Sequence, residues 1–174
     1  MGSMIIFAKE LIWIWTNDIS LAEQSYIYLP YIVVGSSFLA MQEMPFNIVI
    51  ANGFTKYNNI LGLSSLFITL PGYWILTKFY GGIGAAITFS FVQFLMTIVY
   101  LYLVNRKFIK LPIIKLYAYS FIIPISISIV VTFLLNKYIE VDNTRLMTLF
   151  KIGITITTVI VINTLVLIPL EDIK

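Results

Sequence analysis

Long runs without any charged side chain dominate the hydrophobic pattern of this chain. A helix needs about 20 residues to cross the hydrocarbon core of a bilayer, and each run is close to that length. A shorter apolar piece, Met4–Trp15, precedes the runs and contains two charged residues. The pattern therefore predicts five complete transmembrane helices and one partial helix in front of them. The runs are Gln24–Gln42, Tyr57–Thr77, Phe79–Asn105, Leu116–Asn136 and Ile152–Leu170.

The residues between the runs set the expected helix ends. Asn, Gly and Pro next to an apolar run mark positions where a helix starts or stops. All the predicted helices belong to a single transmembrane domain that covers residues 1–174. We expect them over residues 4–15 (partial), 22–52, 58–78, 82–105, 112–136 and 146–169.

Two short segments, Ile125–Ile129 and Ile154–Thr157, alternate apolar and small polar residues, which is typical of a strand. The strands of a membrane barrel, however, need only about 9–11 residues to cross, and the charge-free runs are much longer. A helix also satisfies its own backbone hydrogen bonds inside hydrocarbon. The pattern therefore favours an all-α integral membrane protein.

Composition agrees with this fold class and excludes several functions. Hydrophobic residues make up 60% of the 174 residues and charged residues 11%, whereas soluble domains carry about 25% charged residues. The chain has no cysteine and no histidine, so thiolate catalysis, zinc–thiolate sites and the commonest general base are absent. A membrane enzyme would need histidine, paired carboxylates or a large external loop. We therefore expect no enzyme, no metal site, no cofactor and no nucleic-acid partner.

The segment Gly81-Gly82-Ile83-Gly84 is the only glycine cluster. It lacks the strand, the lysine and the following Ser or Thr of a phosphate-binding loop. We expect it to form a turn and a close contact between two helices.

Loop charges give the expected orientation. The acidic segment Thr16–Glu23 has no basic residue and is expected outside, while basic loops face the cytoplasm. Alternate loops place five basic residues on one side and three on the other, so the first side and the C-terminus are predicted to be cytoplasmic. The five are Lys56, Arg106, Lys107, Lys110 and Lys115, and the three are Lys78, Lys137 and Arg145.

Each expected full span carries small or polar residues at helical spacing. Membrane helices pack through such residues, so most of these stripes are expected to be packing faces. Alternatively, some line a hydrophilic cavity, and the large amides Asn47 and Gln93 are the best candidates for that role. The stripes are Ser36, Ala40, Glu43, Asn47 and Ala51; Asn58, Gly62, Ser65, Thr69 and Gly72; Gly82, Ala86, Ser90, Gln93 and Thr97; Ser120, Pro124, Ser128 and Thr132; and Gly153, Thr157 and Thr164.

Glu43 is a carboxylate inside an expected span. Burying it in hydrocarbon costs at least about 2.5–3.5 kcal/mol, so such a residue usually faces the protein interior. Pro45 follows it and cannot donate a hydrogen bond to the Met41 carbonyl. A kink beside a carboxylate suits a moving gate or a proton or cation site. The alternative is that Glu43 lies near the cytoplasmic interface and reaches water.

Lys9 and Glu10 are the charged residues of the partial helix. Because adjacent residues do not face each other on a helix, they are not a ready ion pair. Lys9 snorkels to the interface if the helix begins near residue 4. If the helix begins further upstream, both residues lie inside the membrane and Lys9 becomes a candidate contact for an anionic substrate.

Three junctions resemble those of one known family. Leu11-Ile-Trp-Ile-Trp-Thr-Asn-Asp18 resembles the end of the seventh helix and the external turn of polysaccharide-repeat flippases. Ile50-Ala-Asn-Gly-Phe-Thr-Lys56 is similar to the "A-x-G-x-x-K" turn after their eighth helix, and Tyr80-Gly-Gly-Ile-Gly-Ala-Ala-Ile87 to the "G-x-x-G-A-A" entry of their tenth helix. These flippases form the oligosaccharide-lipid branch of the multidrug/oligosaccharidyl-lipid/polysaccharide exporter superfamily, which is MATE-like. The resemblance covers residues 4–110.

The resemblance implies a fold and a function. The chain would correspond to the second six-helix bundle of such a flippase, with the first bundle and membrane lipids as partners. The family moves undecaprenyl-diphosphate-linked oligosaccharide repeats for O-antigen or capsule across the bacterial inner membrane by alternating access. Candidate substrate or coupling-ion residues are Lys9, Glu10, Glu43, Asn47 and Gln93, with H⁺ or Na⁺ as the coupling ion. Open alternatives are a drug/cation antiporter or a lipid II flippase of the same superfamily, or a truncated protein without activity.

Overall fold

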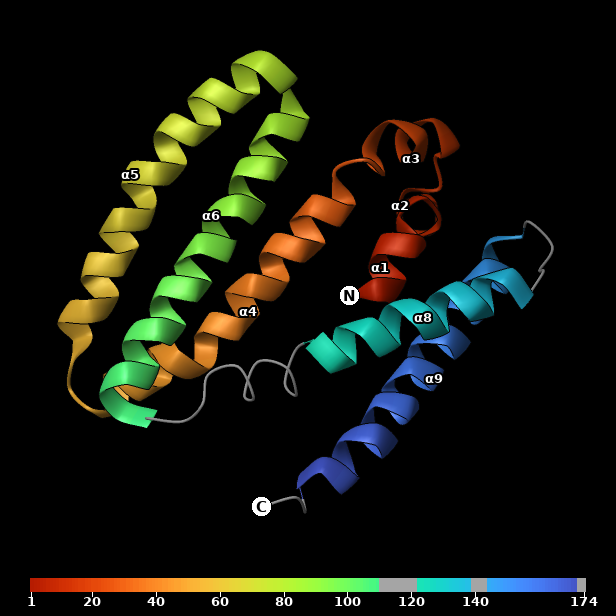
Figure 1. Cartoon of the computed structure of the whole chain (residues 1–174). Coiled ribbons are helices and arrows are strands. Elements are labelled where there is room, and N and C mark those ends of the chain that lie inside the picture. The colour runs from red at the N-terminus through yellow and green to blue at the C-terminus, as the bar shows by residue number, and fades with distance from the viewer. Residues whose placement is uncertain (110–121, 139–143, 172–174) are drawn as a thin grey trace. The chain divides into compact units, whose positions relative to one another are not determined.

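The computed structural model describes residues 1–109, 122–138 and 144–171, and its regular elements are all helical within those ranges. The predicted all-α fold class is confirmed for this part of the chain, and Ile125–Ile129 and Ile154–Thr157 are helical as expected. The elements are α1 (Gly2–Ile6), α2 (Ala8–Thr16), α3 (Ile19–Ser25), α4 (Leu29–Ala51), α5 (Thr55–Tyr80), α6 (Gly82–Val104), the π-helical turn η1 (Asn105–Ile109), α8 (Ile123–Tyr138) and α9 (Arg145–Glu171) (Figure 1).

Within the described ranges, four helical segments are long and apolar enough to cross a membrane: Leu29–Ala51, Thr55–Tyr80, Gly82–Lys107 and Arg145–Val166. The helix Ile123–Tyr138 is apolar but has only 16 described residues. The first part of the helix expected over 112–136 lies outside the described residues. The predicted total of five complete spans therefore stays a prediction.

Contacts divide the chain into two compact units. Residues 27–113 form one unit, and residues 1–26 together with 114–174 form the other. The division concerns compactness within each unit, so the expectation of one transmembrane domain over residues 1–174 stays a prediction.

In the unit of residues 27–113, α6 packs against both α4 and α5 (Figure 1). Gly35 of α4 lies against Phe89 and the backbone of Ser90, and the Ser90 hydroxyl donates a hydrogen bond to the Tyr31 carbonyl. Small residues on both helices thus let their backbones approach closely.

The turn between α5 and α6 confirms the expectation for the glycine cluster. Gly81 has φ +60°, and its N–H closes α5 by donating to the Thr77 carbonyl at 2.8 Å. A Cβ on Gly84 would lie 2.1 Å from the Leu76 carbonyl oxygen. These glycines therefore provide a turn and a close backbone contact.

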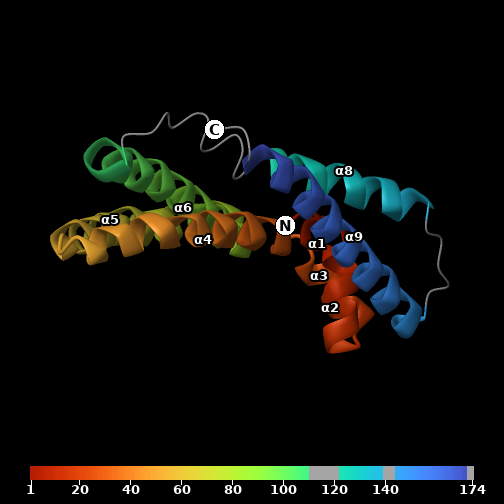
Figure 2. The same cartoon turned by 90° about the horizontal axis from the view of Figure 1, so that it is seen from below.

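In the other unit, α8 and α9 lie side by side in both views, and α1 packs on α8 (Figure 2). The hydroxyls of Ser3 and Thr132 are buried and 3.1 Å apart, within hydrogen-bonding distance. Gly2 lies against the backbone of Ser128 and Ile129. The polar residues at this contact are thus packing residues.

Three expected segments have different bounds. The helix predicted over 22–52 is broken between α3 and α4, because α4 begins at Leu29 with Pro30 in its first turn, where a missing N–H costs nothing. The segment Thr16–Glu23, expected as a loop, contains most of α3, whose first turn is capped by Asp18 accepting from the Leu21 N–H at 3.1 Å. The partial helix expected over 4–15 is interrupted at the buried Phe7 and continues to Thr16.

Candidate functional site

The polar stripe of α4 faces away from α6. Ser36, Ala40, Glu43 and Asn47 are all exposed, whereas Gly35 and Val49 on the other side of the helix are buried. These four residues therefore do not serve the contact of α4 with α6. They form an exposed polar face, which we call the α4 stripe.

Glu43 is the charged member of the α4 stripe. Its carboxylate has no hydrogen bond or ion pair with any residue in the described part of the chain. Glu43 lies eight residues before the end of α4 at Ala51, which places it about 12 Å along the helix axis from that end. This position is well inside a helix of spanning length, so the carboxylate needs water, an ion or another protein surface near it.

Pro45 lies within α4, two residues after Glu43, and is buried. Because proline has no N–H, the Met41 carbonyl lacks its usual partner one turn along the helix. The backbone next to the carboxylate is thus easier to bend than the rest of α4.

A polar network joins α4 to α6 on the packed side. The Gln42 amide nitrogen lies 3.0 Å from Gln93 Oε1 and 3.0 Å from Thr97 Oγ1. The Thr97 hydroxyl is 3.0 Å from the Phe38 carbonyl, to which it can donate, and Thr97 is buried. Gln93, which the sequence indicated as a cavity residue, is half-buried in this contact. Its position favours packing, while a role in a pathway stays a prediction.

Gln42 was missing from the predicted site residues. It lies next to Glu43, and adjacent helical residues point about 100° apart. The Gln42 amide and the Glu43 carboxylate therefore lie on different sides of α4: Gln42 contacts α6, and Glu43 is exposed. That spacing was a usable signal for two separate polar faces.

Lys9 and Glu10 lie on α2, in the unit of residues 1–26 and 114–174. Lys9 Nζ donates to Glu23 Oε1 at 2.9 Å, and both side chains are about half exposed. The Glu23 hydrogen bond and charge raise the pKa of Lys9 above its usual value, so the ammonium stays protonated at physiological pH. As expected, Lys9 does not pair with Glu10. The Lys9 ammonium is already bound by a carboxylate.

The remaining stripes divide between packed and exposed. Ala86 and Thr97 of α6 and Ser128 and Thr132 of α8 are buried, so these two stripes are packing faces. Ser120 lies outside the described residues. In contrast, Gly153, Thr157 and Thr164 of α9 are exposed, and a Cβ on Gly153 would meet no atom within 4 Å.

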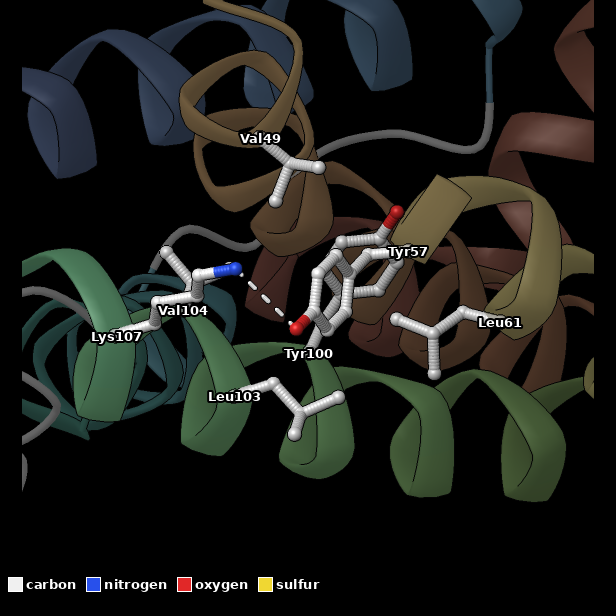
Figure 3. A pocket seen from close by; sticks show the side chains of 7 residues that line it. All are labelled: Val49, Tyr57, Leu61, Tyr100, Leu103, Val104 and Lys107. Carbon is white, nitrogen blue, oxygen red and sulfur yellow. Dashed lines mark hydrogen bonds between the residues drawn. The ribbon is translucent and has the colours of Figure 1, made fainter. Parts of the chain in front are cut away.

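A small pocket lies where the ends of α4 and α6 meet the start of α5 (Figure 3). Its free space is about 10 Å³, no more than one water molecule needs. The Tyr100 hydroxyl nearby donates to the Asn58 side-chain oxygen, and Lys107 Nζ donates to the Tyr57 hydroxyl at 3.2 Å. The pocket is therefore too small for a substrate. It is lined by Val49, Tyr57, Leu61, Tyr100, Leu103, Val104 and Lys107.

No protein family, curated protein or solved structure matches this chain. Within the described residues, no group of three or more His, Cys, Asp or Glu side chains is arranged to hold a metal ion. The candidate site is therefore defined by the structure of this chain alone. It consists of an unpaired carboxylate on an exposed polar face of an apolar helix, close to a proline.

Proposed function

We propose that this chain is the second helical bundle of a flippase in the bacterial inner membrane, which moves undecaprenyl-diphosphate-linked oligosaccharide repeats to the outer leaflet. The observation that carries the proposal is the exposed, unpaired carboxylate of Glu43 in the α4 stripe. Transport would proceed by alternating access, without nucleotide hydrolysis.

The energetics of the bilayer support a water-filled path beside α4. An ionised carboxylate facing lipid at this depth would cost at least about 2.5–3.5 kcal/mol. Asn47 lies one turn after Glu43 on the same face, and its amide adds a second polar group that lipid cannot hydrogen-bond. A hydrophilic cavity next to a second bundle would solvate both side chains, and such a cavity is what a sugar substrate requires.

The same residues suggest how movement could be coupled to an ion. A carboxylate without a protein partner can bind H⁺ or Na⁺, and loading it neutralises the only charge on the stripe. Pro45 next to it weakens the helix backbone where a gate would bend. In this proposal Glu43 binds the coupling ion and Asn47 contacts the sugar, while Lys9 and Glu10 of the other unit stay predicted contacts for substrate or ion.

The positions of two junction motifs also support the flippase proposal. The short turn from α4 into α5 lies at residues 52–54, within the motif of residues 50–56, and the turn into α6 lies at Gly81, within the motif of residues 80–87. These are the places where the resembling flippases have their corresponding turns.

The experiment is flipping of a fluorescent undecaprenyl-diphosphate oligosaccharide in proteoliposomes, with the chain alone and with a co-reconstituted first bundle of a flippase. We expect Glu43→Gln to reduce the rate at least about tenfold, since one lost charge interaction of about 1.4 kcal/mol has that effect. Glu43→Asp keeps the carboxylate and should retain most of the rate, as should Met44→Leu at the neighbouring exposed position. Wild-type flipping by Glu43→Gln, or no flipping by the unmodified chain in either preparation, would contradict the proposal.

An antiporter of small cations is the second candidate, because a lone carboxylate on a polar face is also what a cation site requires. Efflux of ethidium from the same vesicles distinguishes the two. Cation efflux that depends on Glu43 without any flipping would favour the antiporter.

A further inference from the structure

Two short helices, α2 and α3, form a helical hairpin in the unit of residues 1–26 and 114–174. Lys9 at the start of α2 forms an ion pair at 2.9 Å with Glu23 near the end of α3, so the two helices run antiparallel. They have nine and seven residues, which makes them about 14 and 11 Å long, whereas the hydrocarbon core of a bilayer is about 30 Å thick. Neither helix can therefore cross a membrane alone. We call α2, α3 and the turn between them the α2–α3 hairpin.

Local hydrogen bonds define the turn of the α2–α3 hairpin. Asn17 has φ 59°, and its N–H closes α2 by donating to the Trp13 carbonyl at 2.8 Å. The Asp18 N–H donates to the Thr16 hydroxyl at 3.3 Å, and the Asp18 carboxylate caps α3. The turn therefore has a defined backbone that holds its neighbouring side chains in place.

Large apolar side chains on both sides of this turn are exposed. Trp15 precedes the turn and is 88% exposed, and Ile19 follows it and is 57% exposed. In contrast, Ala22 of α3 is buried, so the hairpin has an inner side that is packed. A tryptophan combines a large apolar ring with one N–H donor, which suits a boundary between lipid and water.

Contacts with α9 place the turn at the level of a membrane surface. The Arg145 guanidinium donates to the carbonyl of Ile14, the residue before Trp15. Arg145 is the first residue of α9 and of a segment long and apolar enough to span a membrane, and the ends of such segments lie at the lipid headgroups. Further along α9, Lys151 Nζ lies 5.7 Å from the ring of Phe7, the residue before α2. The helix α2 thus runs beside the first turns of α9 and ends where α9 begins (Figure 2).

The loop charges predict the same placement independently of these contacts. The positive-inside rule puts the acidic segment Thr16–Glu23 and Arg145 on the same side of the membrane. The hydrogen bond from Arg145 to Ile14 joins these two regions of the chain. The contact therefore agrees with the predicted topology.

We propose that the α2–α3 hairpin is an interfacial element that inserts Trp15 and Ile19 among the lipids at the Arg145 end of α9. The partner is the boundary between headgroups and acyl chains, and not a particular anionic headgroup, because the turn carries the carboxylate of Asp18 and no cation. Interfacial elements bury their apolar side chains about 5–10 Å into this boundary. The proposal needs a membrane but does not depend on which substrate is moved, so it can hold if the flippase proposal fails.

The experiment is fluorescence quenching of the full chain in liposomes whose lipids carry bromine either near the headgroup or near the methyl end of the acyl chains. The chain has three tryptophans, so Trp13→Phe with Trp74→Phe leaves Trp15 as the single fluorophore. We expect shallow bromines to quench Trp15 at least about twofold more than deep bromines, since an interfacial ring lies about 5–10 Å into the boundary. Acrylamide in the water should quench Trp15 less than it quenches free tryptophan. Far-UV circular dichroism checks that each variant is folded.

Trp74 provides the matched control, because it is also exposed, at 74%, but lies on the spanning helix α5 six residues before its end, about 9 Å further along the helix axis. With Trp13→Phe and Trp15→Phe, the remaining Trp74 should be quenched more by deep bromines than Trp15 is. An NBD label on Ile19→Cys gives a second measurement that keeps all three tryptophans. Shallow bromines should quench this label most.

Three results would overturn the proposal. Quenching of Trp15 by acrylamide as strong as that of free tryptophan, with no effect of brominated lipid, would place the turn in water. Protection from acrylamide without quenching by either lipid would show that a protein surface covers the turn. Strongest quenching of Trp15 by deep bromines would place the hairpin in the hydrocarbon core. If Trp74 is not quenched by lipid either, the membrane location of the whole chain fails, and both proposals fail with it.

Discussion

Glycines set the distance between helices in the unit of residues 27–113. A Cβ on Gly35 would lie 2.6 Å from the Phe89 ring, and one on Gly72 would lie 2.7 Å from Thr88 Cγ2. At Gly84 the nearest atoms belong to the backbone of Leu76, which cannot rotate away as a side chain can. Gly84 is therefore the position where α5 and α6 tolerate least added volume.

We predict that Gly84→Ala destabilises the chain by about 1–3 kcal/mol, because the added methyl group forces the α5 and α6 backbones apart. Gly62→Ala is the matched control, since a Cβ there meets no atom within 4 Å. It should be neutral, or stabilising by up to about 1 kcal/mol through the lower entropy of the unfolded chain. Unfolding by SDS titration, followed by far-UV circular dichroism, measures both, and equal effects would contradict this account of Gly84.

At the scale of the helix, hydrophobic runs predicted the elements well and their ends less well. The break at residues 26–28 lies in a charge-free Tyr-Ile-Tyr segment, which has no polar residue to mark it, although Pro30 was a clue. Asp18 lies in the segment predicted as a loop, and it is the cap of α3. The length and hydropathy of a segment predict whether it can lie in lipid. They do not predict where a helix is interrupted within an apolar segment.

The same limit applies to the polar faces of α4 and α6. The stripes of α4 and α6 have similar composition, yet the α6 residue Thr97 is buried and the α4 residue Asn47 is exposed. The spacing of small and polar residues indicates that a helix has a polar face. Which face is packed depends on tertiary contacts, such as Gly35 against Phe89, that a single sequence does not contain.

The α4–α6 contact yields a prediction of its own. In a double-mutant cycle of Gln42→Leu and Thr97→Val, we expect a coupling energy of about 0.6–1.7 kcal/mol, the range of interhelical hydrogen bonds in membranes. The two groups are 3.0 Å apart, and Thr97 is buried. Gln42→Leu with Thr69→Val is the control pair, because Thr69 bonds only within α5. Unfolding by SDS titration measures the coupling energy of both pairs. Additive effects of Gln42→Leu and Thr97→Val would show that the polar network contributes nothing to stability.

For the whole molecule, the main feature is that polar faces stay exposed on helices apolar enough to span a membrane. The α4 stripe is exposed in one unit, and Gly153, Thr157 and Thr164 of α9 are exposed in the other. A protein in lipid does not keep a carboxylate such as Glu43 on an outer surface without a use for it. The central claim is therefore that the α4 stripe lines a water-filled path.

Because the chain has no cysteine, single cysteines test this claim directly. Glu43→Cys and Asn47→Cys probe the stripe, and Met44→Cys and Phe46→Cys probe exposed apolar neighbours at the same depth, 62% and 40% exposed. A maleimide reacts with the thiolate, which forms in water and not in hydrocarbon. In membrane vesicles, we predict that a membrane-impermeant maleimide labels positions 43 and 47 at least about tenfold faster than positions 44 and 46, since a penalty of about 1.4 kcal/mol is enough for that ratio. Equal labelling at all four positions, or faster labelling at 44 and 46, would contradict the claim.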